Sequence, residues 1–470
     1  MRMESPRFKE AAVEGLNNKH LRMALARSRE GFIGGRLRAI ELVPEFERLR
    51  QEARDIKNHV LDHLDHYLER YEAAVTAAGG HVHWASDADE ARRIILDICA
   101  RVGAKTITKG KSMVSEEINL NPALVAAGYE VVETDLGEYI IQLAGEPPSH
   151  IVGPALHKTR EQVSELFAHH HQRELKTGIP ELVGEAREML RAKFFRADVG
   201  ITGGNFLIAE TGSSVIVTNE GNGDLSQTLP RVHIVTSGIE RVLPNLDDLA
   251  VLLRVLARSA TGQDTETYTT LSTGPRRADD PDGPEEYHVV LVDNGRSRLL
   301  GGRFRDMLRC IRCGACLNHC PVYGSIGGHA YGWVYPGPMG SVLTPIMQGL
   351  DAAYDLPNAC TLNGRCADVC PVKIPLPDML RELRHMQHRA HLGPRMQHRA
   401  LRAWRWVAER PRLYQFGNRL AARALAWLGG GAQRISWLPL ASGWTRVRDL
   451  PAPQGRTFLE QWQAAKRDAS

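Results

Sequence analysis

The apolar positions of this sequence change their period along the chain. Between residues 36 and 78 they recur at helical spacing among many charges, until Gly79-Gly80 ends the pattern. Short apolar runs then alternate with amphipathic stretches, and we expect strands at 81–84, 106–108, 130–134, 139–142, 150–152, 198–202, 206–209, 214–218, 232–236 and 289–293. Buried strands that alternate with helices predict an α/β domain with a largely parallel sheet.

Capping residues and proline set the expected helices of this domain. These helices run from the N-cap Ser86 to near Gly103, from Ser115 to near Gly128, and from Pro180 in a first turn to about Arg196.

The pattern changes again after Arg303. The segment 323–345 is rich in glycine and proline, and 342–354 has helical character. All cysteines except Cys99 lie within 310–370, and the spacing between their two groups is too long for a compact ferredoxin built of hairpins. We therefore expect an all-α ferredoxin domain in which helices cover the metal clusters.

The first cysteine group carries the most specific motif of the chain. It contains Cys310, Cys313, Cys316 and Cys320 followed by Pro321, in the order C-x2-C-x2-C-x3-C-P. This is the bacterial ferredoxin spacing, in which three cysteines bind one cubane cluster and the fourth binds the other. Iron–sulfur clusters transfer single electrons, so the motif predicts a redox protein.

The second group repeats most of this motif. It contains Cys360, Cys366 and Cys370 followed by Pro371, with Asn363 at the second position. Crossed connectivity assigns one complete cluster to Cys310, Cys313, Cys316 and Cys370. The other cluster receives Cys320, Cys366 and Cys360. It is a three-iron cluster, a four-iron cluster with an oxygen ligand, or a four-iron cluster with one exposed iron; we favour incomplete cysteine ligation of a four-iron cluster.

Two other uses of cysteine fit the pattern less well. Zinc sites favour paired C-x2-C knuckles with a long gap between them. Disulfides require an oxidising compartment, and the charged N-terminus lacks the apolar core of a signal peptide. Cys99 lies in an apolar helical stripe and is expected in the core.

Composition limits the class of protein further. The chain has 470 residues, 43% of them apolar, and a net charge of +4, which does not by itself indicate nucleic acid binding. No uncharged apolar stretch reaches the roughly 18 residues of a membrane span. We expect a cytoplasmic protein of two or three domains.

The C-terminal part is basic and rich in tryptophan. Its arginines include Arg381, Arg384, Arg389, Arg395, Arg399, Arg402, Arg405, Arg410, Arg412, Arg419 and Arg423. One interpretation is a helical segment that docks on the ferredoxin domain and balances cluster charge. The other is a surface that contacts partner subunits or an anionic membrane. No nucleic-acid motif accompanies the charge.

Several motifs in order resemble one known family. They are Thr108-Lys-Gly-Lys111-Ser112, Asp198-Val-Gly-Ile-Thr-Gly-Gly-Asn205, Ala209-Glu210-Thr211-Gly212-Ser213, Thr218-Asn-Glu220-Gly221 and the two cysteine runs. Together they resemble the lactate utilisation protein B family of iron–sulfur proteins over nearly the whole chain. The motif differs from the family pattern at Asn363, where the family has cysteine.

This resemblance implies a domain order and a function. It implies a LUD α/β domain, over 79–300, similar in fold to ribose-phosphate isomerase and CoA transferases, fused to a two-cluster ferredoxin domain, over 301–385. The helical periodicity and the basic composition described above predict a helical segment over 1–78 and a basic, tryptophan-rich helical region over 386–470. The resemblance further implies a complex with two partner subunits that oxidises L-lactate to pyruvate for growth on lactate.

The catalytic contribution of the α/β domain stays open. No G-x-G-x-x-G follows a strand, so a dinucleotide site is not indicated. Lys109, Lys111 and Ser112 follow a strand and are candidates to bind a carboxylate, and Lys111, Glu210 and Glu220 are the catalytic candidates. The alternatives are a CoA-transferase-like or isomerase-like enzyme, with Glu220 as nucleophile and regulatory clusters, and a redox scaffold without a substrate site. The electron acceptor is not identified.

Overall fold

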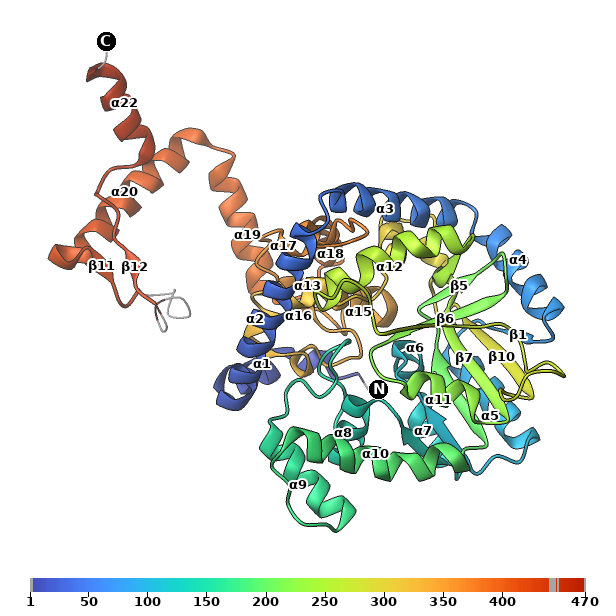
Figure 1. Ribbon diagram of the computed structural model, residues 1–470. Helices are drawn as coiled ribbons and strands as arrows, with labels where there is room; N and C mark the ends of the chain where they lie inside the picture. Colours follow the sequence, from blue (N-terminus) through green and yellow to red (C-terminus); the bar gives the residue numbers. More distant parts are fainter. Residues whose placement is uncertain (1–2, 439–444, 446–447, 469–470) are drawn as a thin grey trace. The chain divides into compact units, whose positions relative to one another are not determined.

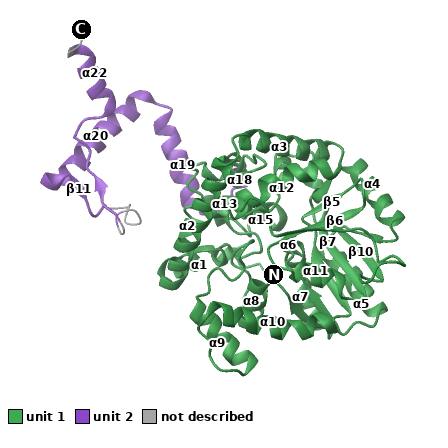
Figure 2. Ribbon diagram, in the orientation of Figure 1, with its two compact units in different colours: residues 1–387 green, residues 388–470 purple. Residues whose placement is uncertain are grey.

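The computed structural model describes residues 3–438, 445 and 448–468. The chain divides into two units, residues 1–387 and 388–470 (Figure 2).

A parallel six-stranded sheet forms the centre of the α/β domain (Figure 1). The strands lie in the order β1 (His81–Ala85), β10 (Glu286–Val292), β7 (Val232–Gly238), β4 (Val199–Gly203), β2 (Thr106–Lys109) and β3 (Glu130–Glu133). All five neighbouring pairs are parallel. The predicted largely parallel sheet is therefore confirmed.

Side-chain alternation in β10 shows why this sheet needs helices on both faces. Val290 and Val292 pack with α5 (Ala88–Arg101) on one face, whereas Val289 and Leu291 pack with α4 (Leu64–Ala77) on the other. Successive side chains of a strand point to opposite faces, so a continuous apolar run fits a strand that is covered twice.

The sheet order reverses at β2 and β4. The chain passes from β2 to β3 on one side, but continues from β4 to β7 on the other. Between β2 and β4 the connecting segments leave in opposite directions, and a crevice opens at the carboxyl ends of the strands.

A second, four-stranded sheet lies beside the first. Its order is β8 (Val242–Leu243), β5 (Phe206–Ile208), β6 (Ser213–Thr218) and β9 (Tyr268–Ser272). The pairs β5–β6 and β6–β9 are antiparallel, and β5–β8 is parallel. Gly212, with φ of +70°, turns the chain between β5 and β6.

Helices make up most of the rest of the α/β domain. They are α6 (Met113–Glu117), α7 (Leu120–Ala126), α8 (Leu136–Ala144), α9 (Arg160–His171), α10 (Ile179–Arg196), α11 (Asn222–Thr228) and α12 (Leu246–Ala260). The helix predicted from Pro180 to Arg196 is confirmed by α10.

Some predicted elements are wrong. The strand expected at 139–142 is part of α8, because the side chain of Asp135 caps that helix and Gly145 ends it with a positive φ. No strand forms at 150–152, where the chain bends. Asp87, not Ser86, accepts the capping hydrogen bond of α5.

Other helices differ in extent from the prediction. The helical pattern predicted over 36–78 begins earlier and is divided among α2 (Lys19–Glu41), α3 (Phe46–Asp62) and α4. The helix expected from Ser115 is two helices, α6 and α7, and Ser112 caps the first of them.

Short helices surround the cysteines in residues 301–389. They are η4 (Arg305–Arg309), α13 (Ala315–Asn318), α14 (Tyr323–Ile326), η5 (His329–Tyr331), α15 (Gly337–Gln348), α16 (Asp355–Ala359), α17 (Arg365–Asp368) and α18 (Leu376–Arg389). The helix expected over 342–354 is α15, which begins at Gly337 and ends at Gln348.

The N-terminal helices complete the cysteine-containing region. One apolar core includes Phe8 of α1 (Phe8–Asn17), Leu25 of α2, Leu252 of α12 and Leu380 of α18. The first helices, the α/β domain and the cysteine region therefore share one apolar core and are not separate domains joined by a linker.

The second unit is mainly helical. It contains α19 (Arg395–Ala408), α20 (Pro411–Gly429), α22 (Phe458–Asp468) and a short antiparallel pair of β11 (Arg434–Ile435) and β12 (Leu450–Pro451). Many of its large apolar side chains are exposed, namely Met396, Leu401, Trp404, Trp406, Leu413, Tyr414, Phe416, Leu420, Trp427, Leu428, Trp437, Phe458, Leu459 and Trp462. Trp444 lies outside the described residues. Among the described helices, none has the length and apolar character needed to cross a membrane.

Candidate metal centre and adjoining cleft

The first cysteine loop turns sharply between η4 and α13. Arg312 and Gly314 have φ values of +60° and +75° and flank Cys313. Two left-handed residues bend the backbone so that the loop wraps around a small volume. At Gly314 an added Cβ would lie 3.2 Å from a side-chain carbon of Val152, so the loop also packs closely on the α/β domain.

Four thiols meet in one small, apolar cavity. Its lining includes Cys310, Cys313, Cys316 and, from more distant sequence, Cys370. The backbone N–H of Ile374 donates to Sγ of Cys370 at 3.3 Å. The four residues assigned to one cluster by the ferredoxin spacing are thus brought together.

The chemistry of this cavity fits a metal cluster. Burial raises the pKa of the Cys313 and Cys316 thiols, and the neighbouring cysteines raise it further. Because the thiolate is the form that binds metal, these buried thiols would lose their protons on binding a cation that compensates the thiolate charge. The described cysteines are all free of disulfides.

The second cysteine loop repeats the backbone of the first. Leu362 and Gly364 have φ values of +56° and +84°, and flank Asn363 as Arg312 and Gly314 flank Cys313. A four-residue helix follows each loop, α17 here and α13 in the first. Asn363 therefore takes the position that Cys313 has in the first loop.

Three further thiols gather at the second loop. Burial, Cys360 and Cys320 raise the pKa of the Cys366 thiol to about 12, which shows that these three groups are neighbours. The N–H of Leu362 donates to Sγ of Cys360 at 3.3 Å. Asn363 is exposed, and its side-chain oxygen accepts a hydrogen bond from the N–H of Arg365 at 3.3 Å.

Positive side chains from the N-terminal helices border the cysteine loops. Arg50 of α3 donates to the carbonyl oxygen of Cys370 at 2.8 Å, and Arg36 of α2 donates to that of Val369 at 3.3 Å. Burial, with Arg50 adding to it, lowers the pKa of Arg36 to about 10. Arginine remains charged at this pKa, so it offsets negative charge held by the loops.

A cleft of about 470 Å³ opens at the crevice between β2 and β4. Gly110, Lys111 and Ser112 follow β2, and Gly203 ends β4 with Gly204 directly after it. Asp135, after β3, also lines it. The cleft therefore lies where open α/β sheets bind ligands.

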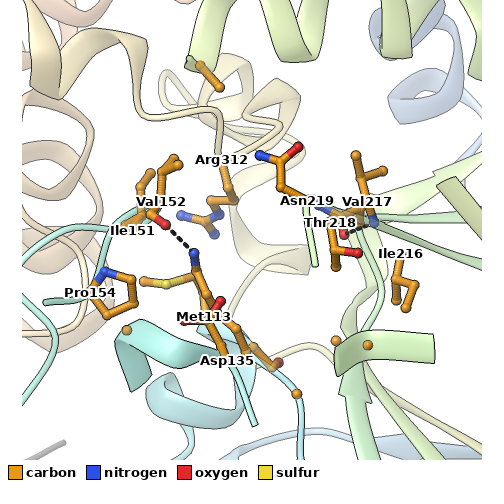
Figure 3. Close-up of a pocket in the computed structure, with 18 of the residues that line it drawn as sticks. Met113, Asp135, Ile151, Val152, Pro154, Ile216, Val217, Thr218, Asn219 and Arg312 are labelled. Carbon is orange, nitrogen blue, oxygen red and sulfur yellow. Dashed lines mark hydrogen bonds between the residues drawn. The ribbon is translucent and has the colours of Figure 1, made fainter. Parts of the chain in front are cut away.

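Opposite charges face this cleft (Figure 3). Lys111 donates through Nζ to the carbonyl oxygen of Val152. Burial and the nearby Asp135 raise the pKa of Glu220, whereas Lys111 opposes the shift. Burial raises the pKa of Glu266, a further lining residue, to about 7.

The cleft and the four-thiol cavity have a common wall. Ile151, Ile311, Arg312 and Cys313 line both. A molecule bound in the cleft would thus lie against Cys313 and next to the cavity that holds the other thiols of this group.

Buried ion pairs support this wall. Glu240 contacts Arg296 at 2.8 Å and Arg312 at 3.7 Å. Burial alone would raise the pKa of Glu240, but Arg296, Arg241 and Arg312 hold it at about 2. The guanidinium of Arg312 also lies 4.1 Å from the centre of the Tyr335 ring.

Lys109 does not reach the cleft. Its ammonium is fully buried, 2.8 Å from Glu133 and 3.1 Å from Glu116. Burial alone would lower its pKa, but these carboxylates hold it above the ordinary value. Glu116, Glu133 and Glu138 could by their spacing hold a metal ion, but the lysine ammonium already supplies the compensating cation.

Only some of the predicted catalytic residues lie at the cleft. Lys111 and Glu220 line the cleft, whereas exposed Glu210 is not among the residues that line it. Cys99 is fully buried in the core of the α/β domain, as predicted.

Sequence reasoning missed two cleft residues, Arg312 and Glu266. Arg312 lies inside the first cysteine motif, so its position next to the predicted metal ligand Cys313 was available as a signal. Glu266 lies between α12 and β9 and has no local motif.

Comparison with known proteins agrees with this arrangement of an α/β domain and a cysteine-rich metal centre. Residues 68–292 match the LUD domain, 306–374 match the 4Fe-4S dicluster domain, and 380–467 match the C-terminal region of lactate utilisation protein B. The fold and the site thus define an iron–sulfur protein built on a LUD domain.

Full-length relatives narrow this class. Lactate utilization protein B of Bacillus licheniformis is 43% identical over 100% of this chain and 98% of its own length. The proteins of the same name from Geobacillus thermodenitrificans and Bacillus subtilis are 46% and 44% identical, cover 98% of this chain, and align over 97% and 96% of their own lengths. The chain belongs to the lactate utilization protein B family.

Proposed function

We propose that this chain is the iron–sulfur electron-transfer subunit of a complex that oxidises L-lactate to pyruvate. The observation that carries the proposal is the meeting of Cys310, Cys313, Cys316 and Cys370 in one cavity whose wall also lines a cleft. The names of the relatives support lactate as the substrate of the complex.

The proposal assigns two clusters to the cysteines. Cys310, Cys313, Cys316 and Cys370 hold the first, and Cys320, Cys360 and Cys366 hold the second, a four-iron cluster with incomplete cysteine ligation at Asn363. Conversion of lactate to pyruvate releases two electrons and two protons. Each cluster supplies a site that accepts and passes on one electron.

The protein residues have defined tasks in this scheme. The apolar lining of the four-thiol cavity, including Ile374 and Leu376, excludes water from the sulfurs. Arg50 and Arg36 provide fixed positive charge at the second loop's end. The arginine charges favour the more negative, reduced state of a bound cluster, whereas the exclusion of water disfavours it, so the two effects together set its reduction potential.

The second unit supports the proposal that two partner subunits bind this chain. Trp404 and Trp406 of α19 are 62% and 54% exposed and lie among arginines. Tryptophan and arginine are enriched at the centres of protein interfaces. We assign this surface to the partner subunits of the lactate-oxidising complex.

Iron analysis of the anaerobically reconstituted chain tests the cluster assignment. We expect about eight irons per chain and two interacting signals in electron paramagnetic resonance after reduction. Cys313→Ser should abolish the first cluster, while Cys99→Ser, which changes a core thiol, should leave the iron content unchanged. Stoichiometric zinc without iron would overturn the assignment.

A further inference from the structure

The cleft next to the first cysteine loop contains a lysine whose charge is not matched by an adjacent carboxylate. Lys111 is partly buried, and its Nζ donates to the carbonyl oxygen of Val152. Within the described part of the chain, no carboxylate oxygen lies within 4 Å of this nitrogen. An ammonium has three N–H donors, so it retains donors for an anionic ligand.

Lys109, two residues earlier in β2, shows the contrast. Its ammonium is fully buried and lies within 3.1 Å of two carboxylates. The two lysines thus have different surroundings. The charge of Lys109 is compensated by carboxylates within the protein, whereas Lys111 faces the cleft. The ammonium of Lys111 is therefore available to an anionic ligand, and that of Lys109 is not.

A second cation borders the same cleft. The Arg312 side chain is 10% exposed and projects toward the space between Val152 and Asn219 (Figure 3). Its nearest carboxylate, on Glu240, is 3.7 Å away, and its other contacts are the Tyr335 ring and the Met339 sulfur. The five N–H donors of a guanidinium are not exhausted by these partners.

Carboxylates provide the opposite chemistry in the cleft. Glu220 and Asp135 line it and lie close enough to each other for like charges to interact, and Lys111 lies near Glu220. Burial and Asp135 raise the pKa of Glu220. A carboxylate oxygen of Glu220 can accept a hydrogen bond from a hydroxyl group of a ligand in the cleft.

We propose that this cleft binds the 2-hydroxy carboxylate substrate itself, with its carboxylate on Lys111 and Arg312 and its hydroxyl toward Glu220. The inference rests on the proposed function, which it extends by assigning substrate binding to this chain rather than to a partner subunit. The wall formed by Ile311, Arg312 and Cys313 places the bound acid beside the first cluster's ligands.

The size of the cleft adds a prediction about substrate range. A volume of about 470 Å³ exceeds what a three-carbon acid fills, and apolar side chains such as Ile140 and Leu256 form part of the lining. Hence 2-hydroxy acids with a longer apolar chain should also bind. The polar groups fix one end of the ligand, and the walls leave room at the other.

Equilibrium dialysis of radiolabelled L-lactate against the full-length, anaerobically reconstituted chain tests the inference. Lys111→Met should weaken binding by about ten- to hundred-fold, the value of a hydrogen bond to a charged group. Lys105→Met is the matched control, because Lys105 is exposed and precedes the same strand at its other end. Its binding should equal that of the unchanged chain.

Propionate and Glu220→Gln test the hydroxyl contact. Propionate has the carboxylate but not the hydroxyl, and should bind more weakly than lactate. Glu220→Gln should reduce this difference even if Lys111→Met fails to fold. Equal affinity for lactate and propionate in the unchanged chain would overturn the assignment of a 2-hydroxy acid.

The outcomes separate the inference from the proposed function. Iron content and the resonance spectrum are measured on the same samples before dialysis. Normal clusters without lactate binding, or with binding that Lys111→Met leaves unchanged, overturn the inference while the electron-transfer function stands. A chain that binds no iron contradicts the proposed function itself.

Discussion

The guanidinium of Arg296 donates to both carboxylate oxygens of Glu117, with nitrogen–oxygen distances of 2.8 Å. Glu117 ends α6, just beyond the cleft loop, and Arg296 follows β10. The hydroxyl of Tyr335, from the cysteine region, donates to the same carboxylate. This buried pair therefore joins the α/β sheet to the part of the chain that carries the thiols.

Glu117→Gln should destabilise the protein strongly. The substitution removes one of the carboxylates that compensate the charge of the buried Arg296 guanidinium. Removal of one partner from a buried ion pair costs about 3–5 kcal/mol of stability. Urea unfolding should show this loss. Glu161→Gln, at an exposed position of α9, is the control, and an equally small effect of both substitutions would contradict the structural role of the pair.

His233 predicts a dependence of stability on pH. It is buried in β7, with Nε2 2.8 Å from the hydroxyl of Thr202, and burial lowers its pKa to about 3. In the unfolded chain this histidine has an ordinary pKa near 6.5. Below about pH 6.5 the unfolded chain therefore binds a proton that the folded chain does not bind. Stability is therefore lost as the pH falls from about 6.5 toward 3.

The magnitude of this effect is measurable at pH 5. The His233 contribution there is a loss of about 2 kcal/mol relative to pH 7. In His233→Gln the difference in unfolding free energy between pH 7 and pH 5 should shrink by about this amount, because the other histidines titrate in both proteins. An unchanged pH dependence would show that His233 is protonated in the folded state.

Asn363→Cys should protect the second cluster. Asn363 is exposed and takes the loop position that Cys313 has in the first run, so under the proposed assignment a cysteine there would supply a fourth thiolate to the second cluster. We expect slower loss of iron to a chelator and an altered resonance signal for this cluster. Asn363→Ser removes the amide without adding a thiolate and should not slow the loss; equal rates in the Asn, Ser and Cys proteins would contradict the ligand assignment.

Substitution of exposed tryptophans should separate assembly from cluster binding. The double substitution of Trp404 and Trp406 by serine should abolish co-purification of the partner subunits, while iron content stays unchanged. Trp84→Ser, at a 43% exposed tryptophan of the first unit, is the control. Retention of both partners by the double variant would show that they bind elsewhere.

Local sequence determines much of what could be predicted. The cysteine spacing identifies thiols that one loop brings together, because the two-residue gaps and the left-handed residues act within a few positions. The alternation of apolar runs likewise predicted the parallel strands, since burial on both faces requires such runs.

Other features depend on contacts that a local pattern does not contain. Tyr139-Ile-Ile-Gln is apolar enough for a strand, yet the cap at Asp135 makes it helical. His150 accepts the N–H groups of Val152 and Gly153, so this apolar segment turns instead of extending. The wall between the cleft and the four-thiol cavity includes both Ile151 and Ile311, which are too far apart in the sequence for a local pattern to place them together.

Electron paramagnetic resonance of the assembled complex after anaerobic addition of L-lactate tests the central claim most directly. If this chain carries the electrons, reduced-cluster signals should appear in the unchanged complex, and lactate oxidation should fail when Cys313 is replaced by serine. Continued oxidation of lactate at the original rate by the complex with Cys313→Ser would contradict the account.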